Sequence, residues 1–522
     1  MILLEANQSR RLDQISQQKF GIRSFELMTR AGNAVAVSLA RNYPDALASD
    51  VLIVAGKGNN GGDGLVAARR LLRSRASVRA ILIGEAVALK GDASRAYREF
   101  VSDGGAVDEV REEAGIGTHL KTRPSAIIDA IFGTGLNAKV DGIAARAIEA
   151  INDLGVPIVA VDIASGVSAD TGAIMGCAVK ATRTVTFGFA KFGHASYPGL
   201  SLCGDLEIVD IGFAPGAISE IAPRGALLEA PDVRPLIRPR ANNSHKGDNG
   251  HLMVIAGSRG KSGAAVLASR AALRTGAGLV TAAIPDCVSE IVAAGQAELM
   301  TEPMPSREGH FAAGATIARL CELIEGKSAV AMGPGIGVSE DAQELVEFLI
   351  TDGAAPERPV LIDADGLNAI AAMGMELLGK AKGPIVMTPH PGEMSRLLRI
   401  STAEVNADRI GAVRWLIAQT GAYVLLKGSR SVIGAPDGTI YINSTGNPGM
   451  GTPGMGDALT GIVSTLMGQR LSPIEALTLG AFVHGYAADR VARSRGSIGY
   501  VTGDLIEELP PALEAIATGD EY

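Results

Sequence analysis

A glycine-rich stretch near the C-terminus, TGNPGMGTPGMGDALTGIVSTL (445–466), constrains the fold of this chain more than any other segment. Glycine and proline fill the loop from Gly446 to Gly456, and apolar residues then recur with helical spacing at Ala458, Leu459, Ile462, Val463 and Leu466. This pattern predicts a flexible loop that leads directly into a helix. Such a loop lets a ligand approach the backbone closely, and the free N–H groups of the first helical turn favour an anion, for which phosphate is the expected ligand.

Asp457 lies at this predicted helix start. An aspartate in that position can simply cap the helix, or it can accept a proton from a hydroxyl group held beside the phosphate. Because the glycine-rich approach to the helix is long, we favour the catalytic interpretation.

Length and composition limit the possible classes of protein. The chain has 522 residues, of which 47% are hydrophobic and 20% charged, values typical of two or three well-packed globular domains. The formal net charge of −8 argues against nucleic-acid binding as the main function. No apolar run approaches the ~20 residues that cross a bilayer, and the N-terminus soon becomes charged, so we expect a cytoplasmic protein without membrane association. Cysteine and histidine lack the CxxC, HxxxH and HxH spacings of zinc sites.

The first half contains predicted helices within residues 9–45 and then a βαβ unit. Its parts are the strand VLIVAG (51–56), the turn GKGNNGGDG, a helix over residues 65–72 and the strand VRAILIG (78–84). The turn contains the GxGxxG pattern of dinucleotide-binding sites at Gly56, Gly58 and Gly61. Asp63 weakens that interpretation, because its carboxylate would compete with a pyrophosphate for the helix start. Together with Asn59 and Asn60 it suggests instead a site for a polar substrate or a hard cation.

Two further strands of the first half end in polar residues. AIIDAIFGTGL (126–136) places Asp129 inside an apolar strand, where a carboxylate needs a partner, and PIVAVDIASGV (157–167) contains Asp162 and Ser165. Either aspartate alone could be a turn former or a helix cap. The carboxyl ends of parallel strands meet at one edge of a sheet, where ligands bind, so we expect these strand ends to share one site.

Together these motifs resemble a known family. AGKGNNGGDG, DAIFGTGL, VDIASG, FGFAKFGHASYPG and DLEIVDIG, within about residues 1–215, are similar to the NAD(P)H-hydrate epimerase domain, also called the YjeF N-terminal domain. The resemblance implies a Rossmann-like fold that interconverts the two epimers of hydrated NAD(P)H. It implies substrate contacts from Asn59, Asn60, Gly61, Gly62, Asp63, Gly133, Thr134, Gly135, Leu136, Asn137, Ala138, Lys139 and Asp162. It also implies a potassium ion held by Asn60, Asp129 and Ser165.

Epimerisation requires an acid or a base that opens or ionises the hydroxylated ring carbon, with help from the ring nitrogen. Asp162 is our first candidate for this role and Lys139 the second. Ala164 stands where the family usually has proline, which changes the rigidity of the turn more than the chemistry. Members of this fold also serve as non-catalytic modules, so a binding or oligomerisation role is the alternative for this half.

A segment rich in proline and arginine follows. We predict an N-terminal domain over residues 1–225, a linker over 226–243 and a C-terminal domain over 244–522. The second domain shows a helix at 263–275 and strands at 252–257, 279–284, 329–337, 359–368, 384–393 and 423–434, a pattern of helices alternating with parallel strands. GKS at 260–262 is not a P-loop, because Ile255 occupies the position of the required upstream glycine.

Three strand ends of the second domain carry residues suited to ligand binding. The backbone carries no side chain at Gly333, Gly335 and Gly337, so a ligand could approach it closely. A simple loop explains these glycines equally well. His390 lies between two prolines in a rigid turn, which favours contact with a ligand. Lys427 ends the strand YVLLK and is followed by GSRS, a combination suited to nucleotide phosphates rather than to an ordinary surface lysine.

The second half resembles the ribokinase-like superfamily, in which a GxGD motif forms the anion hole and supplies the catalytic base; here the motif is Gly454-Met455-Gly456-Asp457. More narrowly, SHKGDNGH, AGSRGKSGAA, MGPGIG, DADGLN, TPHPGE, LKGSRS and GNPGMGTPGMGDALTG, within about residues 240–510, are similar to the ADP/ATP-dependent NAD(P)H-hydrate dehydratases. The resemblance implies ADP binding by Lys427, Gly428, Ser429, Arg430, Ser431 and Gly456. It implies hydrate contacts from Ala264, Gly335, His390 and Asp457, with Asp457 as the base and Mg²⁺ as the metal. Pro453 and Met455 depart from the small residues usual in this loop, so nucleotide preference and loop mobility stay open.

The two resemblances together imply two three-layer α/β domains, each with a mostly parallel sheet between helices, that repair NADH and NADPH hydrates. ADP or ATP would be the co-substrate, and the sequence leaves the choice open. The family also implies a homo-oligomer. The main rival is a ribokinase-like small-molecule kinase, such as a vitamin kinase, fused to a non-catalytic Rossmann-like domain. A kinase would leave a stable phosphorylated product, whereas a dehydratase releases inorganic phosphate.

Overall fold

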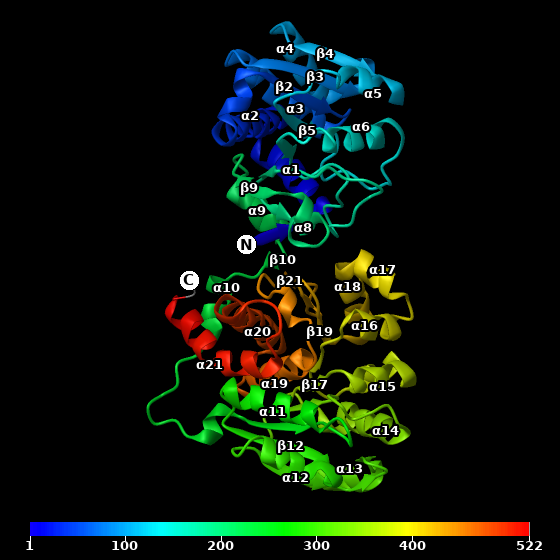
Figure 1. Cartoon of the computed structure of the whole chain (residues 1–522), viewed down its shortest axis with the longest axis vertical. Helices are drawn as coiled ribbons and strands as arrows, with labels where there is room; N and C mark the ends of the chain where they lie inside the picture. Colours follow the sequence, from blue (N-terminus) through cyan, green and yellow to red (C-terminus); the bar gives the residue numbers. More distant parts are fainter. Residues whose placement is uncertain (521–522) are drawn as a thin grey trace. The chain divides into compact units, whose positions relative to one another are not determined.

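The computed structural model describes residues 1–520 and divides into two compact units, one over Met1–Gly225 and one from Ala226 to the C-terminus (Figure 1). Residues 226–243, which the sequence indicates as a linker, fall inside the second unit. They form the short helix α10 (Ala230–Val233) and the 3₁₀ turn η3 (Arg234–Leu236), and Val233 is fully buried in the core of that unit. Among the described residues, no helix is both long enough and apolar enough to span a membrane.

The first unit contains a seven-stranded sheet in the order β4-β3-β2-β5-β6-β7-β9, and each pair of neighbouring strands is parallel. A separate parallel pair joins β1 to β8. The strands are β1 (Ile2–Leu4), β2 (Asp50–Ala55), β3 (Ser77–Ile83), β4 (Ala106–Val110), β5 (Ala126–Ala130), β6 (Ile158–Val161), β7 (Arg183–Phe187), β8 (Ala190–Lys191) and β9 (Asp205–Val209). The helices are α1 (Ala6–Phe20), α2 (Ser24–Asn42), α3 (Asn59–Arg73), α4 (Gly91–Ser102), α5 (Glu113–His119), α6 (Gly142–Asn152), α7 (Phe192–Ala195), α8 (Gly199–Leu202) and α9 (Pro215–Ile221).

Helices cover both faces of this sheet. In the central strand β2, Val51 and Ile53 pack with residues of α2, α3 and α4, whereas Leu52 and Val54 pack on the other face with residues of α5 and α6. This alternation follows from the two-residue period of a strand, and it explains why β2 is apolar from Val51 to Ala55. The predicted α/β class is therefore confirmed for this unit.

The glycine-rich turn after β2 differs from its prediction. Helix α3 begins at Asn59, not at Leu65, so most of the predicted loop is helical. A Cβ on Gly61 would lie 2.0 Å from the carbonyl oxygen of Gly56, and one on Gly64 would lie 2.4 Å from the Cβ of Ala130. The glycines therefore serve close packing of the helix against the sheet rather than loop flexibility.

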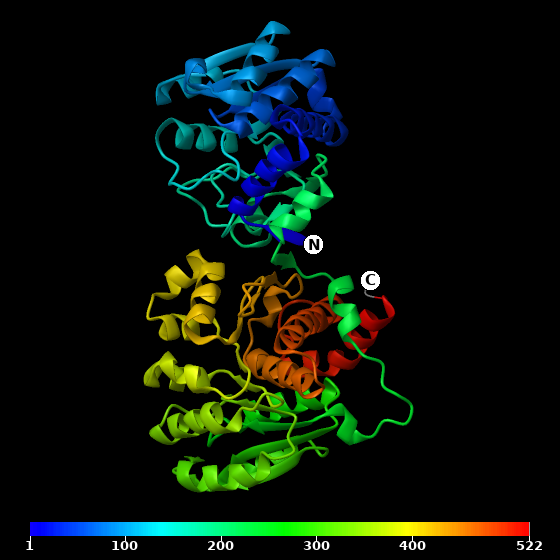
Figure 2. The same cartoon turned by 180° about the vertical axis from the view of Figure 1, so that it is seen from behind.

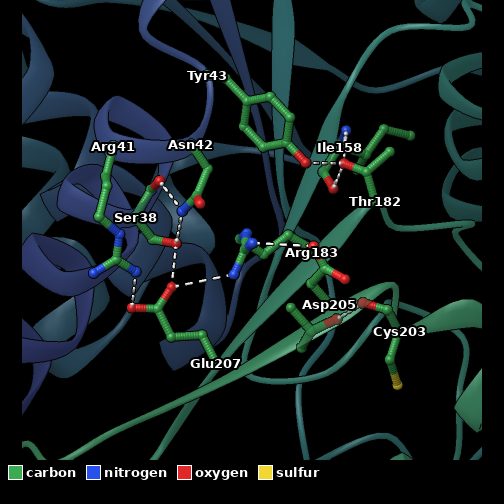
Figure 3. Close-up of polar contacts among 11 residues, drawn as sticks. Ser38, Arg41, Asn42, Tyr43, Ile158, Thr182, Arg183, Cys203, Asp205 and Glu207 are labelled. Carbon is green, nitrogen blue, oxygen red and sulfur yellow. Dashed lines mark hydrogen bonds and ion pairs between the residues drawn. The ribbon is translucent and has the colours of Figure 1, made fainter.

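A polar network holds the edge strand β9 against α2 (Figure 3). Glu207 accepts hydrogen bonds from the Ser38 hydroxyl and from Arg41, both at 2.6 Å. Arg183 of β7 lies 3.5 Å from the same carboxylate. None of these four residues lines the cavity described below. We assign them a structural role, and partly exposed pairs of this kind contribute about 1 kcal/mol at most.

The second unit contains a sheet in the order β13-β12-β11-β16-β17-β18-β19-β20-β21, parallel from β13 to β19 and antiparallel beyond. Its strands are β11 (His251–Ile255), β12 (Leu279–Pro285), β13 (Met300–Met304), β16 (Ala329–Met332), β17 (Val360–Ile362), β18 (Ile385–Met387), β19 (Tyr423–Leu426), β20 (Val432–Gly434) and β21 (Ile440–Ile442). Two short strands, β14 (Ser306–Arg307) and β15 (His310–Phe311), form a hairpin, and β10 (Gly225–Leu227) lies at the boundary of the units.

Helices again cover this sheet on both faces. They are α11 (Ser262–Arg274), α12 (Ser289–Gly295), α13 (Ala313–Leu323), α14 (Glu340–Phe348), α15 (Asp365–Met373), α16 (Pro391–Leu398), α17 (Thr402–Ala407), α18 (Arg409–Thr420), α19 (Met455–Gly468), α20 (Pro473–Arg495) and α21 (Thr502–Thr518). Helices α11, α19, α20 and α21 share one core with the sheet. Helices α14 to α16 and α18 form a row away from that core, and the same separation is visible from behind (Figures 1 and 2). The single tryptophan, Trp415, lies on α18 and is 45% exposed.

The prediction of one continuous strand over residues 423–434 is wrong. The segment forms the two antiparallel strands β19 and β20, and residues 427–431 make the turn between them. Gly428 adopts φ +143° and Arg430 φ +55°, conformations that no strand contains. The turn thus presents the predicted nucleotide-binding residues at the carboxyl end of β19.

Candidate functional site

The first unit contains a cavity of about 890 Å³ that most of its predicted site residues line. Those in the lining are Asn59, Asn60, Asp63, Gly133, Thr134, Gly135, Leu136, Asn137, Ala138, Lys139 and Asp162. Gly61 and Gly62 are absent from it because they lie buried inside α3, where a Cβ on Gly62 would lie 2.7 Å from the methyl carbon of Met28. The cavity lies where β2, β5 and β6 end, the position at which parallel sheets bind ligands.

Asp162 follows β6 directly and is almost fully buried. Its backbone adopts φ +67°, an uncommon conformation for a residue with a side chain and one that clusters at functional sites. Lys191 donates a hydrogen bond to Oδ1 at 2.5 Å, and the Thr186 hydroxyl donates to the same oxygen at 3.0 Å. The backbone N–H of Thr134 donates to Oδ2 at 3.3 Å. Burial alone would raise the pKa of Asp162, but Lys191 outweighs it and lowers the pKa below its usual value.

Asp129 and Ser165, two of the three predicted potassium ligands, lie together behind the cavity. The Ser165 hydroxyl donates to Oδ1 of Asp129 at 2.6 Å, and the Ser165 N–H donates to Oδ2 at 2.8 Å. Burial raises the pKa of Asp129 to about 6, and the hydrogen bonds from Ser165 only partly offset that rise. The third predicted ligand, Asn60, lies against Gly133, where a Cβ would be 2.7 Å from its Oδ1. Its amide nitrogen is buried without a hydrogen-bond partner.

Sequence reasoning missed two residues of this cavity, Lys191 and Asp13. Lys191 lies within the quoted motif FGFAKFGHASYPG, where a lysine among apolar residues signals a buried ion pair. Asp13 lies on α1, which turns Ser9, Asp13 and Gln17 toward the cavity, while Ile15 packs into a separate apolar cluster. The four-residue spacing of these polar residues was the available signal.

In the second unit, helix α19 begins at Met455, directly after the glycine-rich loop. Gly454 adopts φ +92°, a left-handed conformation that suits glycine and lets the chain turn into the helix. Asp457 lies in the first helical turn, as the sequence predicts. Burial, and then the negative charge of Asp363, raise the pKa of Asp457 to about 7. A carboxylate with that pKa suits proton transfer at neutral pH, and the first-turn N–H groups beside it suit an anion.

Lys427 and Asp363 form a buried ion pair next to Asp457. The Lys427 ammonium lies 2.6 Å from Oδ1 of Asp363, whose Oδ2 accepts a hydrogen bond from the Thr460 hydroxyl at 2.7 Å. A Cβ on Gly456 would lie 3.4 Å from the Lys427 nitrogen, so the two predicted nucleotide-binding residues are neighbours. Burial alone would lower the pKa of Lys427, but the nearby carboxylates outweigh it and raise the pKa. The site therefore keeps a fixed positive charge.

His390 and Glu393 extend this cluster. Nδ1 of His390 accepts hydrogen bonds from the N–H groups of Gly392 and Glu393, so the ring caps helix α16. Its Nε2 lies 3.3 Å from the Glu393 carboxylate, which in turn lies 3.6 Å from the Lys427 ammonium. The histidine thus has a local structural role that the sequence did not indicate, and half of its side chain stays exposed.

Ala264 and Gly335 are also brought together. A Cβ on Gly335 would lie 3.2 Å from the Cβ of Ala264 and 3.1 Å from that of Lys261. The Lys261 ammonium lies 3.0 Å from Asp365, which also accepts a hydrogen bond from the N–H of Gly337 at 2.9 Å. Asp365 is one of the charges that raise the pKa of Asp457, so this group lies near that aspartate.

The remaining predicted nucleotide-binding residues, Gly428, Ser429, Arg430 and Ser431, form the turn after Lys427. The Ser431 hydroxyl donates to the carbonyl oxygen of Gly428 at 3.0 Å. Arg409 of α18 donates to the carbonyl oxygens of Leu426 and Lys427, at 3.2 and 3.3 Å. Helix α18 therefore stabilises the turn, a contact that the sequence did not predict. Asp363 and Glu393, within the motifs DADGLN and TPHPGE, are the other site residues that sequence reasoning did not single out.

Comparison with known proteins assigns both units. Residues 252–511 match the family model described as NAD(P)H-hydrate dehydratase, and residues 24–193 match the model described as YjeF-related protein N-terminus. The chain is 40% identical to the bifunctional NAD(P)H-hydrate repair enzyme of Moorella thermoacetica, over 98% of this chain and 97% of that protein. It is 33% identical to the Escherichia coli enzyme of the same name, over 97% of this chain and 92% of that protein.

A solved structure is similar to the second unit. It is the ADP/ATP-dependent NAD(P)H-hydrate dehydratase from Bacillus subtilis, co-crystallised with ATP and Mg²⁺. The match has 27% identity and a TM-score of 0.50, and it covers 56% of this chain and 98% of that one. Because the full-length relatives match nearly the whole chain, both units included, the chain belongs to the family of bifunctional NAD(P)H-hydrate repair enzymes.

Proposed function

We propose that this chain restores NADH and NADPH from their hydrates in two steps. The first unit interconverts the R and S epimers of the hydrate, and the second unit dehydrates the S epimer with ADP as co-substrate. The observation that carries the proposal is the placement of Asp457 in the first turn of α19, beside the Lys427–Asp363 ion pair and with a pKa of about 7. Full-length relatives with the same two units bear the name of this repair activity.

In the second unit, Asp457 would take the proton from the ring hydroxyl, whose oxygen then attacks the terminal phosphorus of ADP. The phosphoryl group moves to the hydrate and AMP leaves. The N–H groups at the start of α19 and the Lys427 ammonium would stabilise the charge on the transferred group. The ring nitrogen then expels phosphate, which is a far better leaving group than hydroxide. Loss of a proton from the neighbouring ring carbon forms the carbon–carbon double bond, returns the lone pair to the nitrogen and restores the dihydronicotinamide ring.

Mg²⁺ fits this cluster. Mg²⁺ is commonly bound by one or two carboxylates together with substrate phosphates and water, and Asp363 and Glu393 supply carboxylates beside Lys427. Among residues 1–520, no group of three or more acidic, histidine or cysteine side chains is arranged as a metal cage by itself, so the nucleotide would complete the site. When bound, the metal would neutralise charge on the phosphates.

In the first unit we propose the cavity as the epimerase site, with potassium beside it. Asp129 is fully buried, and within the described part of the chain it has no cationic side chain as a partner. A monovalent cation held by Asp129, Ser165 and Asn60 would supply the missing positive charge and keep this carboxylate ionised. We also expect the homo-oligomeric state that the family resemblance implies.

The test is recovery of dihydronicotinamide absorbance from a mixture of R and S NADH hydrate, with Mg²⁺ and either ADP or ATP. Wild type should restore the whole mixture with release of inorganic phosphate, and Asp457→Ala should restore none. Recovery that stops at the S fraction would contradict the epimerase half. A stable phosphorylated product in place of phosphate release would favour the kinase alternative.

A further inference from the structure

We propose that Asp13 is the catalytic acid and base of the epimerase step, and that Asp162 is a fixed anion rather than the proton-transfer group. This inference rests on the proposed function of the first unit. It replaces Asp162 and Lys139, the two candidates that the sequence suggested.

The hydrogen bonds of Asp162 leave it little freedom to exchange a proton. Lys191 and Thr186 occupy Oδ1 and the Thr134 N–H occupies Oδ2. Lys191 is itself buried, and it also donates to the Thr186 hydroxyl at 2.7 Å. Protonating Asp162 would leave this lysine as an unpaired buried charge, which is strongly unfavourable.

Asp13 has the opposite environment. It lines the same cavity, and within the described part of the chain its carboxylate takes part in no hydrogen bond or ion pair. Helix α1 is well anchored, because β1 pairs with β8 so that Leu4 lies opposite Lys191, and the Ala6 N–H donates to Asp170 at 2.7 Å. Asp13 is thus a free carboxylate on a fixed helix that faces the substrate space.

The electrostatics agree with this division of roles. Burial, and then the charge of Asp162, raise the pKa of Asp13 to about 6, close to the value that proton transfer at neutral pH requires. Burial, and then the charges of Asp162, Asp13 and Asp92, raise the pKa of Asp63 well above its usual value. Carboxyl groups whose pKa values differ, such as Asp13 and Asp162 here, are typical of acid–base sites.

The acidic lining also indicates the type of intermediate. Five aspartates line the cavity (Asp13, Asp63, Asp92, Asp141 and Asp162) together with Arg10, Lys57, Lys139 and Lys191, so carboxylates are at hand to stabilise positive charge in the substrate. Asp13 donates its proton to the ring hydroxyl, the carbon–oxygen bond breaks, and the lone pair of the ring nitrogen forms a second bond to that carbon. The products are an iminium ion and water. Water then adds to the opposite face of the carbon, the nitrogen regains its lone pair, and the released proton returns to Asp13 through water in the cavity.

The experiment follows the interconversion of purified R and S NADH hydrate by chromatography, without nucleotide, using the full chain. Asp13→Asn should lower the catalysed rate by about 10²- to 10⁴-fold, because it removes the group that transfers the proton. Asp13→Glu should recover part of that loss, and added formate should partly rescue Asp13→Ala. Asp63→Asn should lose less than Asp13→Asn, because Asp63 lines the same cavity but is not the proposed proton-transfer group.

The matched control is Asp170→Asn, which alters an α1-anchoring carboxylate outside the cavity lining and should keep at least half of the wild-type rate. The thermal unfolding of the Asp13→Asn chain, measured by calorimetry, should keep the transition of the first unit, which shows that this unit is folded. A wild-type rate in Asp13→Asn, or a loss that formate and glutamate both fail to restore, overturns the assignment of Asp13. Absence of interconversion by wild type overturns the proposed epimerase function itself.

Discussion

At the scale of single residues, the proposed role of Asp457 as a base predicts how the activity of the second unit depends on pH. Its carboxylate must be deprotonated to act as a base, and its pKa is about 7. We therefore expect kcat/KM for dehydration of the S hydrate to fall about tenfold for each pH unit below that value. Asp457→Asn should lower kcat by about 10²- to 10⁴-fold at every pH. A rate that stays constant between pH 5 and pH 8 would contradict this role.

The same carboxylate should weaken the fold at neutral pH. The pKa of Asp457 is higher in the folded chain than its ordinary value of 3.8, so between those two values the folded state binds more protons than the unfolded state. Stability therefore decreases as the pH rises through this window. Asp457→Asn should raise the Tm of the second unit at pH 8 and change it little at pH 4, as measured by calorimetry. A lower Tm at pH 8 would show that the carboxylate stabilises the unit.

Lys427 offers a further test at this scale. Lys427→Met should raise the KM for ADP at least tenfold, because the site loses its fixed positive charge and Asp363 loses its partner. Arg409→Lys is a suitable comparison, since Arg409 contacts only the backbone of the same turn. An unchanged KM in Lys427→Met would place the phosphates elsewhere.

The sequence identified residues that local motifs mark, and it missed residues that act through distant partners. Asp457 and Lys427 follow from a helix start and a strand end. The ion pair between Asp363 and Lys427 spans 64 positions, and no local pattern contains it. The sequence suggested Asp162 as the acid–base group, and only the folded chain shows its ion pair with Lys191, 29 residues later.

At the scale of elements, glycines fix how closely helices approach each other. Gly461 of α19 faces α11, and a Cβ there would lie 2.1 Å from the carbonyl oxygen of Ala268. Gly461→Ala should therefore destabilise the second unit by about 1–3 kcal/mol, because the two helices must move apart. The free energy of unfolding in urea measures this effect. Gly503→Ala is the control, since a Cβ on Gly503 meets nothing within 4 Å and should cause no loss.

The elements also show where sequence patterns were ambiguous. The α/β class and the alternation of strands and helices were predictable, because buried parallel strands are apolar along their length. The residue at which α3 starts was not predictable. A glycine-rich segment can be a flexible loop or a closely packed helix, and the sequence alone does not distinguish them. Residues 423–434 divide into β19 and β20 because Gly428 and Arg430 adopt positive φ angles. The amino-acid composition of this segment does not predict those angles.

At the scale of the whole molecule, each unit has its own core and its own proposed site. The similar dehydratase from Bacillus subtilis consists of little more than the counterpart of the second unit. Residues 226–522 expressed alone should therefore fold and dehydrate the S hydrate at close to the wild-type rate. They should leave the R hydrate unrepaired until residues 1–225 are added. Accelerated loss of the R hydrate with the second unit alone would contradict this division of labour.

Because Trp415 lies in the second unit, its fluorescence can be used to follow that unit separately. The only indole of the chain lies on α18, the helix whose Arg409 supports the turn after Lys427. Tryptophan emission, excited at a wavelength that tyrosine does not absorb, therefore reports on the second unit alone. A denaturation followed by fluorescence, compared with one followed by circular dichroism, separates the melting of the two units without cutting the chain. Quenching of the same emission by ADP would report nucleotide binding without any label.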